Sequence, residues 1–182
     1  MTMPLDQYPA LRKHYELLRR WNPRLNLVSR RSLADAEARH YGESLLLASK
    51  LPAGSLRVVD VGSGAGFPGF VVAAARPDCL VTLVESDQRK CTFLREVSRG
   101  MPNVRILPVR AETVQEQFDW LTMRAVKWNS ALANLASAYA LLLGEEDAEE
   151  LSSAISWDLI ERLPGTGARV LCIGHNVPRE TI

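Results

Sequence analysis

A glycine-rich turn behind a short apolar run is the part of this chain whose residue types point most directly to chemistry. Residues 57–61 read RVVDV, and glycines occupy four of the eight positions 62–69. Glycine is needed where a backbone bends sharply and approaches a ligand, because no Cβ stands in the way. The helix expected behind the turn offers unpaired N–H groups to polar or anionic ligand groups. The pattern predicts a strand, a tight turn and a helix that together hold a nucleotide-like cofactor.

Two carboxylates narrow the choice of cofactor. Glu85 ends a second predicted strand and lies 23 residues after Gly62, close to the spacing at which an acidic residue binds a ribose diol. A dinucleotide site is one alternative, but its G-x-G-x-x-G pattern requires glycine at the position that Phe67 occupies. The observed pattern has Asp60 two residues before Gly62 and then Gly64 and Gly66. It resembles the first motif of S-adenosylmethionine-dependent methyltransferases, in which the carboxylate accepts hydrogen bonds from the loop and helps to place the cationic end of the cofactor.

A third polar position follows the third predicted strand, at Arg110-Ala111-Glu112. In a methyltransferase, a polar side chain beside an exposed main-chain N–H at this place reads the edge of the adenine. The alternative is that Glu112 caps the next short helix. Ala111 and Glu112 are therefore candidate cofactor-binding residues.

The elements that must position these residues alternate from residue 56 onward. We expect strands at 56–61, 80–85, 103–109 and 118–123, with helices at 66–76 and 87–99 between them. This alternation predicts parallel βαβ units in a doubly wound, Rossmann-like α/β sheet. After it we expect a helix at 127–138, a strand at 138–143, an acidic helix at 144–154, and two strands at 155–160 and 168–174 around a turn at 164–167.

The first 54 residues read as helical. Residues 5–21 form an amphipathic pattern that Pro23 ends or kinks, and Ser32 is placed to cap a second helix that reaches Leu51, with a break near Gly42. At 182 residues, 47% hydrophobic and 24% charged, the chain is expected to form one domain. We divide it into a helical substrate-side extension, 1–54, and a cofactor-binding core, 55–182.

Several classes of protein are disfavoured by composition. No run approaches the ~18 apolar residues of a membrane span, and the first residues lack the pattern of a signal peptide. The three cysteines are widely spaced and form no CxxC, so neither a disulfide framework nor a metal site is expected. These features favour a reduced, cytoplasmic compartment and a protein without a membrane or metal partner.

Charge is unevenly distributed although the net charge is +1. Residues 1–57 hold ten Lys/Arg against five Asp/Glu, whereas residues 110–182 hold six against eleven. Either these charges are solvated helix faces, or the N-terminal part faces a polyanion such as nucleic acid.

Together the motifs of residues 21–126 resemble one family, the bacterial RsmG (GidB) methyltransferases, which make 7-methylguanosine in small-subunit (16S) ribosomal RNA. The continuation Gly66-Phe67-Pro68-Gly69 is unusual among methyltransferases at large. The other matching positions are Trp21-Asn22, Asn26-Leu27, Ser29, Arg39-His40, Ser44, 60–65, 82–86, Arg89-Lys90, Phe93-Leu94, 110–112, Phe118-Asp119 and Arg124-Ala125.

The resemblance implies a site and a mechanism. Gly62, Phe67, Ala111, Glu112 and Arg124 would contact S-adenosylmethionine, with Glu85 near its ribose. Guanine N7 carries a free lone pair, so no general base is needed, and Arg124 would orient the substrate where it meets the cofactor. The alternative for Arg124 is a surface arginine paired with Asp119 or Glu112.

The N-terminal substrate face would include Asn26, Arg39 and His40. The implied partner is ribosomal RNA or the small ribosomal subunit. His14 and His175 carry no functional prediction.

The last third departs from the family. A Lys-Gly pair is usual after the later strand, but here an acidic run, residues 145–150, follows Gly144. Carboxylates repel RNA phosphates, so the acceptor is less determined than the cofactor. The alternatives are a methyltransferase that acts on a small molecule or protein, and a cofactor-binding module without catalysis. The acidic run also suits the start of a helix.

Overall fold

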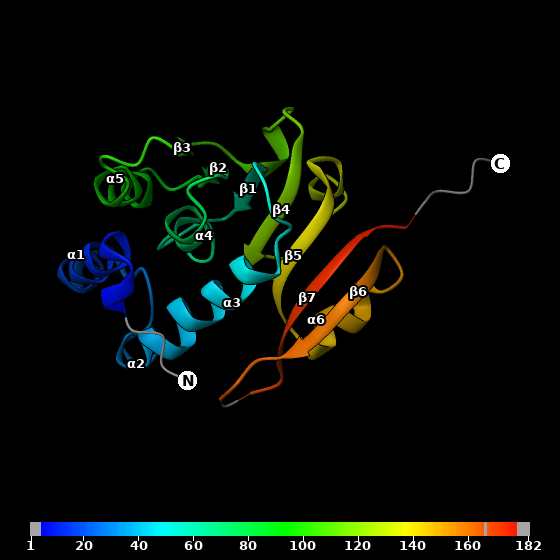
Figure 1. Cartoon of the computed structure of the whole chain (residues 1–182), viewed down its shortest axis with the longest axis horizontal. Coiled ribbons are helices and arrows are strands. Elements are labelled where there is room, and N and C mark those ends of the chain that lie inside the picture. The colour runs from blue at the N-terminus through cyan, green and yellow to red at the C-terminus, as the bar shows by residue number, and fades with distance from the viewer. Residues whose placement is uncertain (1–4, 166, 178–182) are drawn as a thin grey trace.

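The computed structural model describes residues 5–165 and 167–177 and contains a seven-stranded sheet with the order β3-β2-β1-β4-β5-β7-β6 (Figure 1). Strands β1 to β5 are parallel to one another, and β7 is antiparallel to both β5 and β6. The strands are β1 Arg57–Val61, β2 Leu80–Val84, β3 Val104–Leu107, β4 Phe118–Arg124, β5 Ala136–Gly144, β6 Ile155–Arg162 and β7 Arg169–Asn176. The predicted Rossmann-like α/β sheet is confirmed.

The sheet is covered on both faces, which explains why β1 and β2 are almost continuously apolar. Val58 packs in a core with helices α1, α3, α4 and α5, whereas Val59 and Val61 face the opposite core with α6. Successive residues of a strand point to opposite faces, so this alternation follows from the pleat. The helices are α1 Pro9–Leu25, α2 Arg30–Ala34, α3 Glu43–Lys50, α4 Gly69–Ala75, α5 Gln88–Val97 and α6 Glu145–Leu151.

Two details of the N-terminal prediction are wrong. Helix α1 continues through Pro23 to Leu25 and ends at Asn26, whose left-handed backbone lets its N–H donate to Asn22 O at 2.9 Å. Pro23 cannot donate to the carbonyl of Arg19, four residues earlier, and the helix ends two residues after it. The cap of α2 is Ser29, which accepts the N–H of Ser32 at 3.1 Å, so Ser32 lies inside the helix.

The break expected near Gly42 is a π-helical segment, Glu37–Gly42, which leads directly into α3.

The predicted helix at 127–138 is also wrong. A single 3₁₀ turn, Leu132–Asn134, occupies this stretch, and strand β5 already begins at Ala136. The Asn129 side chain accepts the N–H groups of Ala131 at 3.0 Å and Leu132 at 3.3 Å, which favours a turn over a regular helix. The expected turn at 164–167 joins β6 to β7, and its residue Thr166 lies outside the described residues.

Candidate active site

The glycine turn lies at the carboxyl end of β1, and two of its glycines show why a side chain is excluded. Gly62 has φ +65°, and a Cβ there would lie 2.5 Å from Cγ2 of Val126. Gly69 begins α4, and its Cβ would lie 2.4 Å from the Cβ of Asp60. The first glycine lets the β4 end approach the turn, and the second lets the helix approach the strand.

Glu85 connects this turn to the end of β2. Its Oε2 accepts the N–H of Gly64 at 2.9 Å, and its Oε1 accepts the N–H of Asp87 at 2.9 Å. The residue is 8% exposed and lines a small pocket. Each carboxylate oxygen has a further lone pair, so Glu85 can support the loop and still accept a ligand hydroxyl.

Asp60 lies beneath the turn and is fully buried. Its Oδ1 accepts the hydroxyl of Thr122, the residue beside it on β4, at 2.8 Å. Its Oδ2 has no hydrogen-bond partner among the described residues, and burial raises the pKa of this carboxyl to about 6. Asp60 lines neither the small pocket nor the larger one beside it, and its contact with the cofactor stays a prediction.

The small pocket, of about 190 Å³, lies between the ends of β1, β2 and β3. It brings together four of the predicted cofactor-binding residues: Gly62, Glu85, Ala111 and Glu112. Glu112 lies inside the 3₁₀ turn Ala111–Thr113 and does not cap it, and its Oε1 accepts the side-chain N–H of Asn129 at 3.2 Å. Asn129, which the sequence analysis did not single out, also lines this pocket. Gly64 and Gly66 do not line it, although Gly64 holds Glu85 in place.

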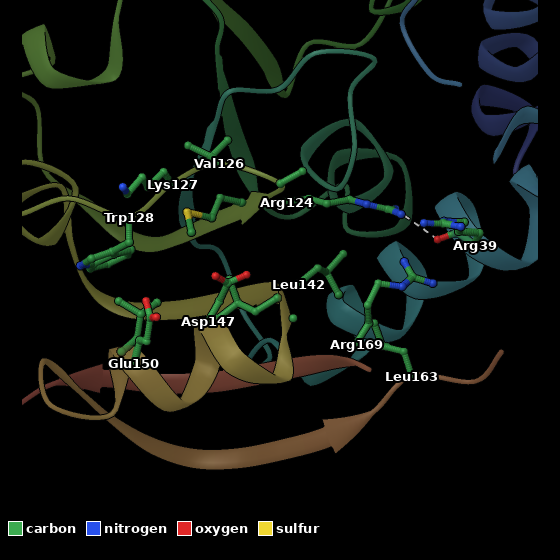
Figure 2. A pocket seen from close by; sticks show the side chains of 15 residues that line it. Arg39, Arg124, Val126, Lys127, Trp128, Leu142, Asp147, Glu150, Leu163 and Arg169 are labelled. Carbon is green, nitrogen blue, oxygen red and sulfur yellow. Dashed lines mark hydrogen bonds between the residues drawn. The ribbon is translucent and has the colours of Figure 1, made fainter. Parts of the chain in front are cut away.

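A larger pocket of about 780 Å³ adjoins the small one, and Val126 lines both. Arg39, Arg124 and Arg169 gather at one end, while Trp128 and the acidic side of α6 form the other (Figure 2). The remaining lining residues are Met123, Ala125, Val126, Lys127, Leu142, Leu143, Gly144, Asp147, Glu150, Leu151 and Leu163. This pocket therefore combines cationic, aromatic and anionic groups.

Arg124, at the end of β4, points toward the N-terminal helices. Its Nη1 donates to Arg39 O at 3.1 Å, and its Nη2 lies 3.5 Å from Oε2 of Glu43. The side chain is 13% exposed, and burial lowers its pKa to about 10, so the group stays charged at neutral pH. The alternative pairing with Asp119 or Glu112 is wrong, since Asp119 accepts the N–H of Arg57 at 2.6 Å instead.

The sequence analysis did not single out Glu43, which lies two residues before the apolar run Leu45-Leu46-Leu47. A glutamate this buried is almost always paired. Its side chain is 1% exposed and forms a bidentate ion pair with Arg169 of β7, at 2.9 and 2.5 Å. The pair joins residues that lie 126 positions apart.

The predicted substrate residues lie in three different places. Arg39 reaches the large pocket, whereas Asn26 is exposed at the end of α1. His40 is 6% exposed and stacks on Phe67 with ring centroids 4.8 Å apart. Burial and nearby arginines lower the pKa of His40 to about 3. Neither His40 nor Phe67 lines the small or the large pocket, and their ligand contacts stay predictions.

His14 connects α1 to the glycine turn and was also missed. It is fully buried, its Nε2 donates to Ala65 O at 2.7 Å, and its Nδ1 accepts the Tyr41 hydroxyl at 2.6 Å. The ring stacks on Phe70 with centroids 4.6 Å apart. Burial lowers the pKa of His14 to about 4, which keeps the imidazole neutral. A clue lay in the sequence, since His14 lies three residues after Leu11 and four before Leu18 on the apolar side of the helix.

Among the described residues no group of His, Cys, Asp or Glu is arranged to hold a metal ion. Within the same ranges, no helix has the length and apolarity that crossing a membrane requires. Cys79, Cys91 and Cys172 are free and buried.

Comparison with solved structures supports the fold. Magnesium protoporphyrin IX methyltransferase from Synechocystis superposes with a TM-score of 0.64 at 13% identity, covering 90% of this chain and 97% of that one. A fibrillarin/Nop5p complex gives 0.62 at 15% identity, covering 78% and 84%. At such low identity these similarities concern the architecture alone.

Comparison of sequences identifies the family. The family model described as rRNA small subunit methyltransferase G (GidB) matches residues 7–150. The ribosomal RNA small subunit methyltransferase G of Acidiphilium cryptum is 39% identical over 178 residues, covering 87% of this chain and 81% of that one. Its counterpart in Rhodospirillum centenum is 42% identical over 161 residues, covering 81% and 73%. The chain therefore belongs to the ribosomal RNA small subunit methyltransferase G family, as its motifs predicted.

Proposed function

We propose that this protein transfers a methyl group from S-adenosylmethionine to N7 of a guanine in small-subunit (16S) ribosomal RNA. Membership of the methyltransferase G family supports the reaction class and the RNA substrate. The observation that carries the proposal is the pair of adjoining pockets that share Val126. The small pocket is lined by the carboxylates of Glu85 and Glu112, which can accept hydrogen bonds from the cofactor. The large pocket is lined at one end by three arginines, which can bind the phosphates of a polyanionic substrate.

The small pocket suits the adenosine part of the cofactor. Glu85 retains lone pairs that can accept the ribose hydroxyls. The turn that contains Ala111 and Glu112 offers polar groups to the adenine edge, while Val84, Val109 and Leu132 supply apolar contacts. Bound there, S-adenosylmethionine would supply a methyl group already activated by its sulfonium. Glu85 holds the loop through the N–H of Gly64, and Asp60 beneath the loop is fixed by the hydroxyl of Thr122.

The large pocket suits a nucleotide of the RNA. Guanine N7 has no proton to remove, so the residues around it position the base and exclude water. Arg124 orients the substrate from the end of β4, with Arg39 and Arg169 beside it to face phosphates. A base within folded RNA must first be unstacked, at about a few kcal/mol, and the exposed part of Trp128 offers a surface on which it can stack.

The acidic wall of the pocket supports a second candidate function. Asp147 and Glu150 would repel phosphates, which favours a small-molecule or protein acceptor. The same carboxylates can also accept the N–H groups on the base-pairing edge of a guanine, which is compatible with RNA. The cytoplasm, where ribosomes are assembled, is the compartment that this proposal implies.

The acceptor can be tested with labelled S-adenosylmethionine and the native protein. We expect label in small-subunit particles or their RNA, with digestion releasing 7-methylguanosine. Label that appears in protein or small molecules would reject the RNA acceptor. Cofactor binding without transfer to any of these would identify a binding module.

The cofactor site can be tested by titration calorimetry. Gly62→Arg should abolish S-adenosylmethionine binding, because any side chain there collides with Val126 between the two pockets. Gly100→Arg is the matched control, since Gly100 also has a positive φ, +86°, but a Cβ at that position would meet nothing within 4 Å. Native binding by both variants would contradict the assignment of the pocket.

A further inference from the structure

Glu43 is a buried carboxylate that the proposed methyl transfer does not use directly. It opens α3, and its side chain is 1% exposed. Arg169 donates to both of its oxygens, Nη1 to Oε2 at 2.9 Å and Nη2 to Oε1 at 2.5 Å. Arg124 Nη2 lies 3.5 Å from Oε2. One carboxylate thus contacts two guanidinium groups that both line the large pocket.

The three residues come from elements that are far apart in the chain. Arg124 ends β4, Arg169 begins β7, and these two strands are separated in the sheet by β5. The Glu43 carboxylate joins both arginines to the N-terminal helices. Figure 2 shows Arg39, Arg124 and Arg169 gathered at one end of the pocket. Without a carboxylate between them, like-charged guanidinium groups would repel each other and separate.

Glu43 does not neutralise this group of side chains. Three arginines stand against one carboxylate, which leaves an excess of two positive charges. Nε of Arg39 and Nε of Arg169 are buried and have no hydrogen-bond partner among the described residues. The cluster therefore has charge and donors left for an anionic group, while Glu43 holds the direction in which Arg124 and Arg169 point.

The position of Arg124 also bears on the cofactor side. Ala125 follows it with φ +54°, a left-handed conformation that turns the chain toward Val126. Val126 lines both pockets and lies against Gly62. A shift of the Arg124 side chain would thus move the substrate relative to the methyl donor.

We propose that Glu43 is a positioning residue for methyl transfer, which holds Arg124 and Arg169 so that the substrate meets the methyl donor in the reactive geometry. This inference rests on the proposed function, because it takes the large pocket as the RNA site. Glu43 acts through the two arginines and does not touch the reacting atoms.

Three roles for Glu43 predict three different results for Glu43→Gln. If the residue only maintains the fold, cofactor binding, RNA binding and rate all fall together with the melting temperature. If it only tunes charge, loss of a negative group tightens RNA binding and steepens its salt dependence by about one counterion. If it positions the arginines, the rate of methyl transfer falls while RNA binding does not weaken.

The experiment measures S-adenosylmethionine affinity, affinity for small-subunit particles and the single-turnover rate with both saturating. For Glu43→Gln we expect a rate lower by about tenfold to a hundredfold, with the cofactor Kd within about twofold of the native value. Glu116→Gln is the matched control, since Glu116 also contacts two arginines, Arg57 and Arg105, but lines neither of the two site pockets. It should retain the native rate.

A second variant keeps the test decisive if Glu43→Gln does not fold. Glu43→Asp keeps the negative charge but shortens the side chain by one methylene. If Glu43→Gln folds, the positioning role predicts that the rate of Glu43→Asp lies between the rates of the native protein and Glu43→Gln. If Glu43→Gln does not fold, the rate of Glu43→Asp should lie below the native rate. A native rate in a folded Glu43→Gln or Glu43→Asp overturns the inference. A loss of cofactor binding in step with rate also overturns it, in favour of a purely structural role. If the native protein methylates no particle or RNA, the proposed function fails, and this inference fails with it.

Discussion

Two carboxylates in this protein each contact two arginines, and they lie at opposite ends of the sheet. Glu43 joins Arg124 and Arg169 at the end where the two pockets lie, and its side chain is 1% exposed. Glu116 joins Arg57 and Arg105 near the amino ends of β1 and β3, and its side chain is 36% exposed. The same arrangement of one glutamate between two arginines therefore occurs both in the interior and at the surface of the described part of the chain.

The pKa values of the two carboxyl groups shift in opposite directions, because one group is exposed and the other is buried. Hydrogen bonding and charge from Arg105 and Arg57 hold the pKa of Glu116 below its ordinary value. Burial raises the pKa of Glu43 even though Arg124 and Arg169 oppose the shift. Desolvation outweighs attraction at the Glu43 carboxyl, and a buried ion pair is by itself weak evidence of a net gain in stability. An exposed cluster forms with little desolvation and contributes little.

The largest contrast is expected in stability. Glu43→Ala should lower the free energy of unfolding by about 3–5 kcal/mol, because it leaves buried guanidinium groups without a counter-charge. Glu116→Ala should lower it by about 1 kcal/mol or less. Urea denaturation of both variants measures the difference. Equal losses would show that burial does not distinguish the two clusters.

The second prediction concerns how stability changes at acidic pH, where the buried groups His14 and Asp60 have opposite effects. The buried His14 has a pKa of about 4 against 6.5 in the unfolded chain, so the unfolded chain binds more protons between these values. Stability should fall as pH drops through this window, by an amount on the order of 3 kcal/mol from His14. Asp60, whose pKa is raised to about 6, acts in the opposite direction below that pH.

His14→Gln isolates the histidine contribution. Glutamine offers one donor and one acceptor, which can replace the bonds to Ala65 O and Tyr41 without a titratable group. From pH 7 to 4, the unfolding free energy of the variant should fall less than that of the native protein, by up to about 3 kcal/mol. An unchanged slope would mean that His14 is not the group that resists protonation.

The third contrast concerns geometry rather than charge. Arg169→Lys keeps the positive charge but loses the fork that donates to both oxygens of Glu43. We expect a loss of about 2 kcal/mol in the free energy of unfolding. Arg105→Lys, at the exposed cluster, should change it by about 0.5 kcal/mol or less. Thermal denaturation of the two variants would show whether the fork matters only in the buried cluster.

The smallest effect is a salt dependence. The contribution of Glu116, compared with Glu116→Gln, should fall from below about 1 kcal/mol toward zero as salt rises to 1 M, because exposed charges are screened. The difference between the native protein and Glu43→Gln should persist in the same titration. If salt removes both differences, the Glu43 cluster is more hydrated than its exposure indicates.

The parts of the molecule that were predictable from sequence are those with a local pattern. The alternation of strands and helices from β1 to β4 was confirmed, with β1 and β4 each within one residue of the predicted bounds. The position of Gly62, Glu85, Ala111 and Glu112 at one edge of the sheet was also predictable, because parallel pairing brings the ends of β1, β2 and β3 together there. Local sequence is sufficient there because a parallel sheet brings the carboxyl ends of its strands to one edge. The contacts of these residues with the cofactor stay a prediction.

The prediction failed partly for a local reason and partly because of distant contacts. In the stretch 127–138, the Asn129 side chain favours a turn, and the last residues pair with β4, Ala136 with Phe118 and Ala138 with Trp120. Glu43 and Arg169 meet only because α3 lies beside the start of β7. No residue spacing within α3 or β7 predicts the contact between Glu43 and Arg169. Arg169 also lies beyond residues 7–150, which match the family model.

The bonds of His14 have a consequence for protein engineering. One ring nitrogen holds the carbonyl of Ala65 in the glycine turn, and the other holds Tyr41 of the N-terminal extension. The first helices are therefore not a detachable module that can be exchanged to redirect the enzyme to another acceptor. A chimera that carries the N-terminal helices of another protein therefore also needs the glycine turn of that protein, because His14 hydrogen-bonds the N-terminal helices to the turn.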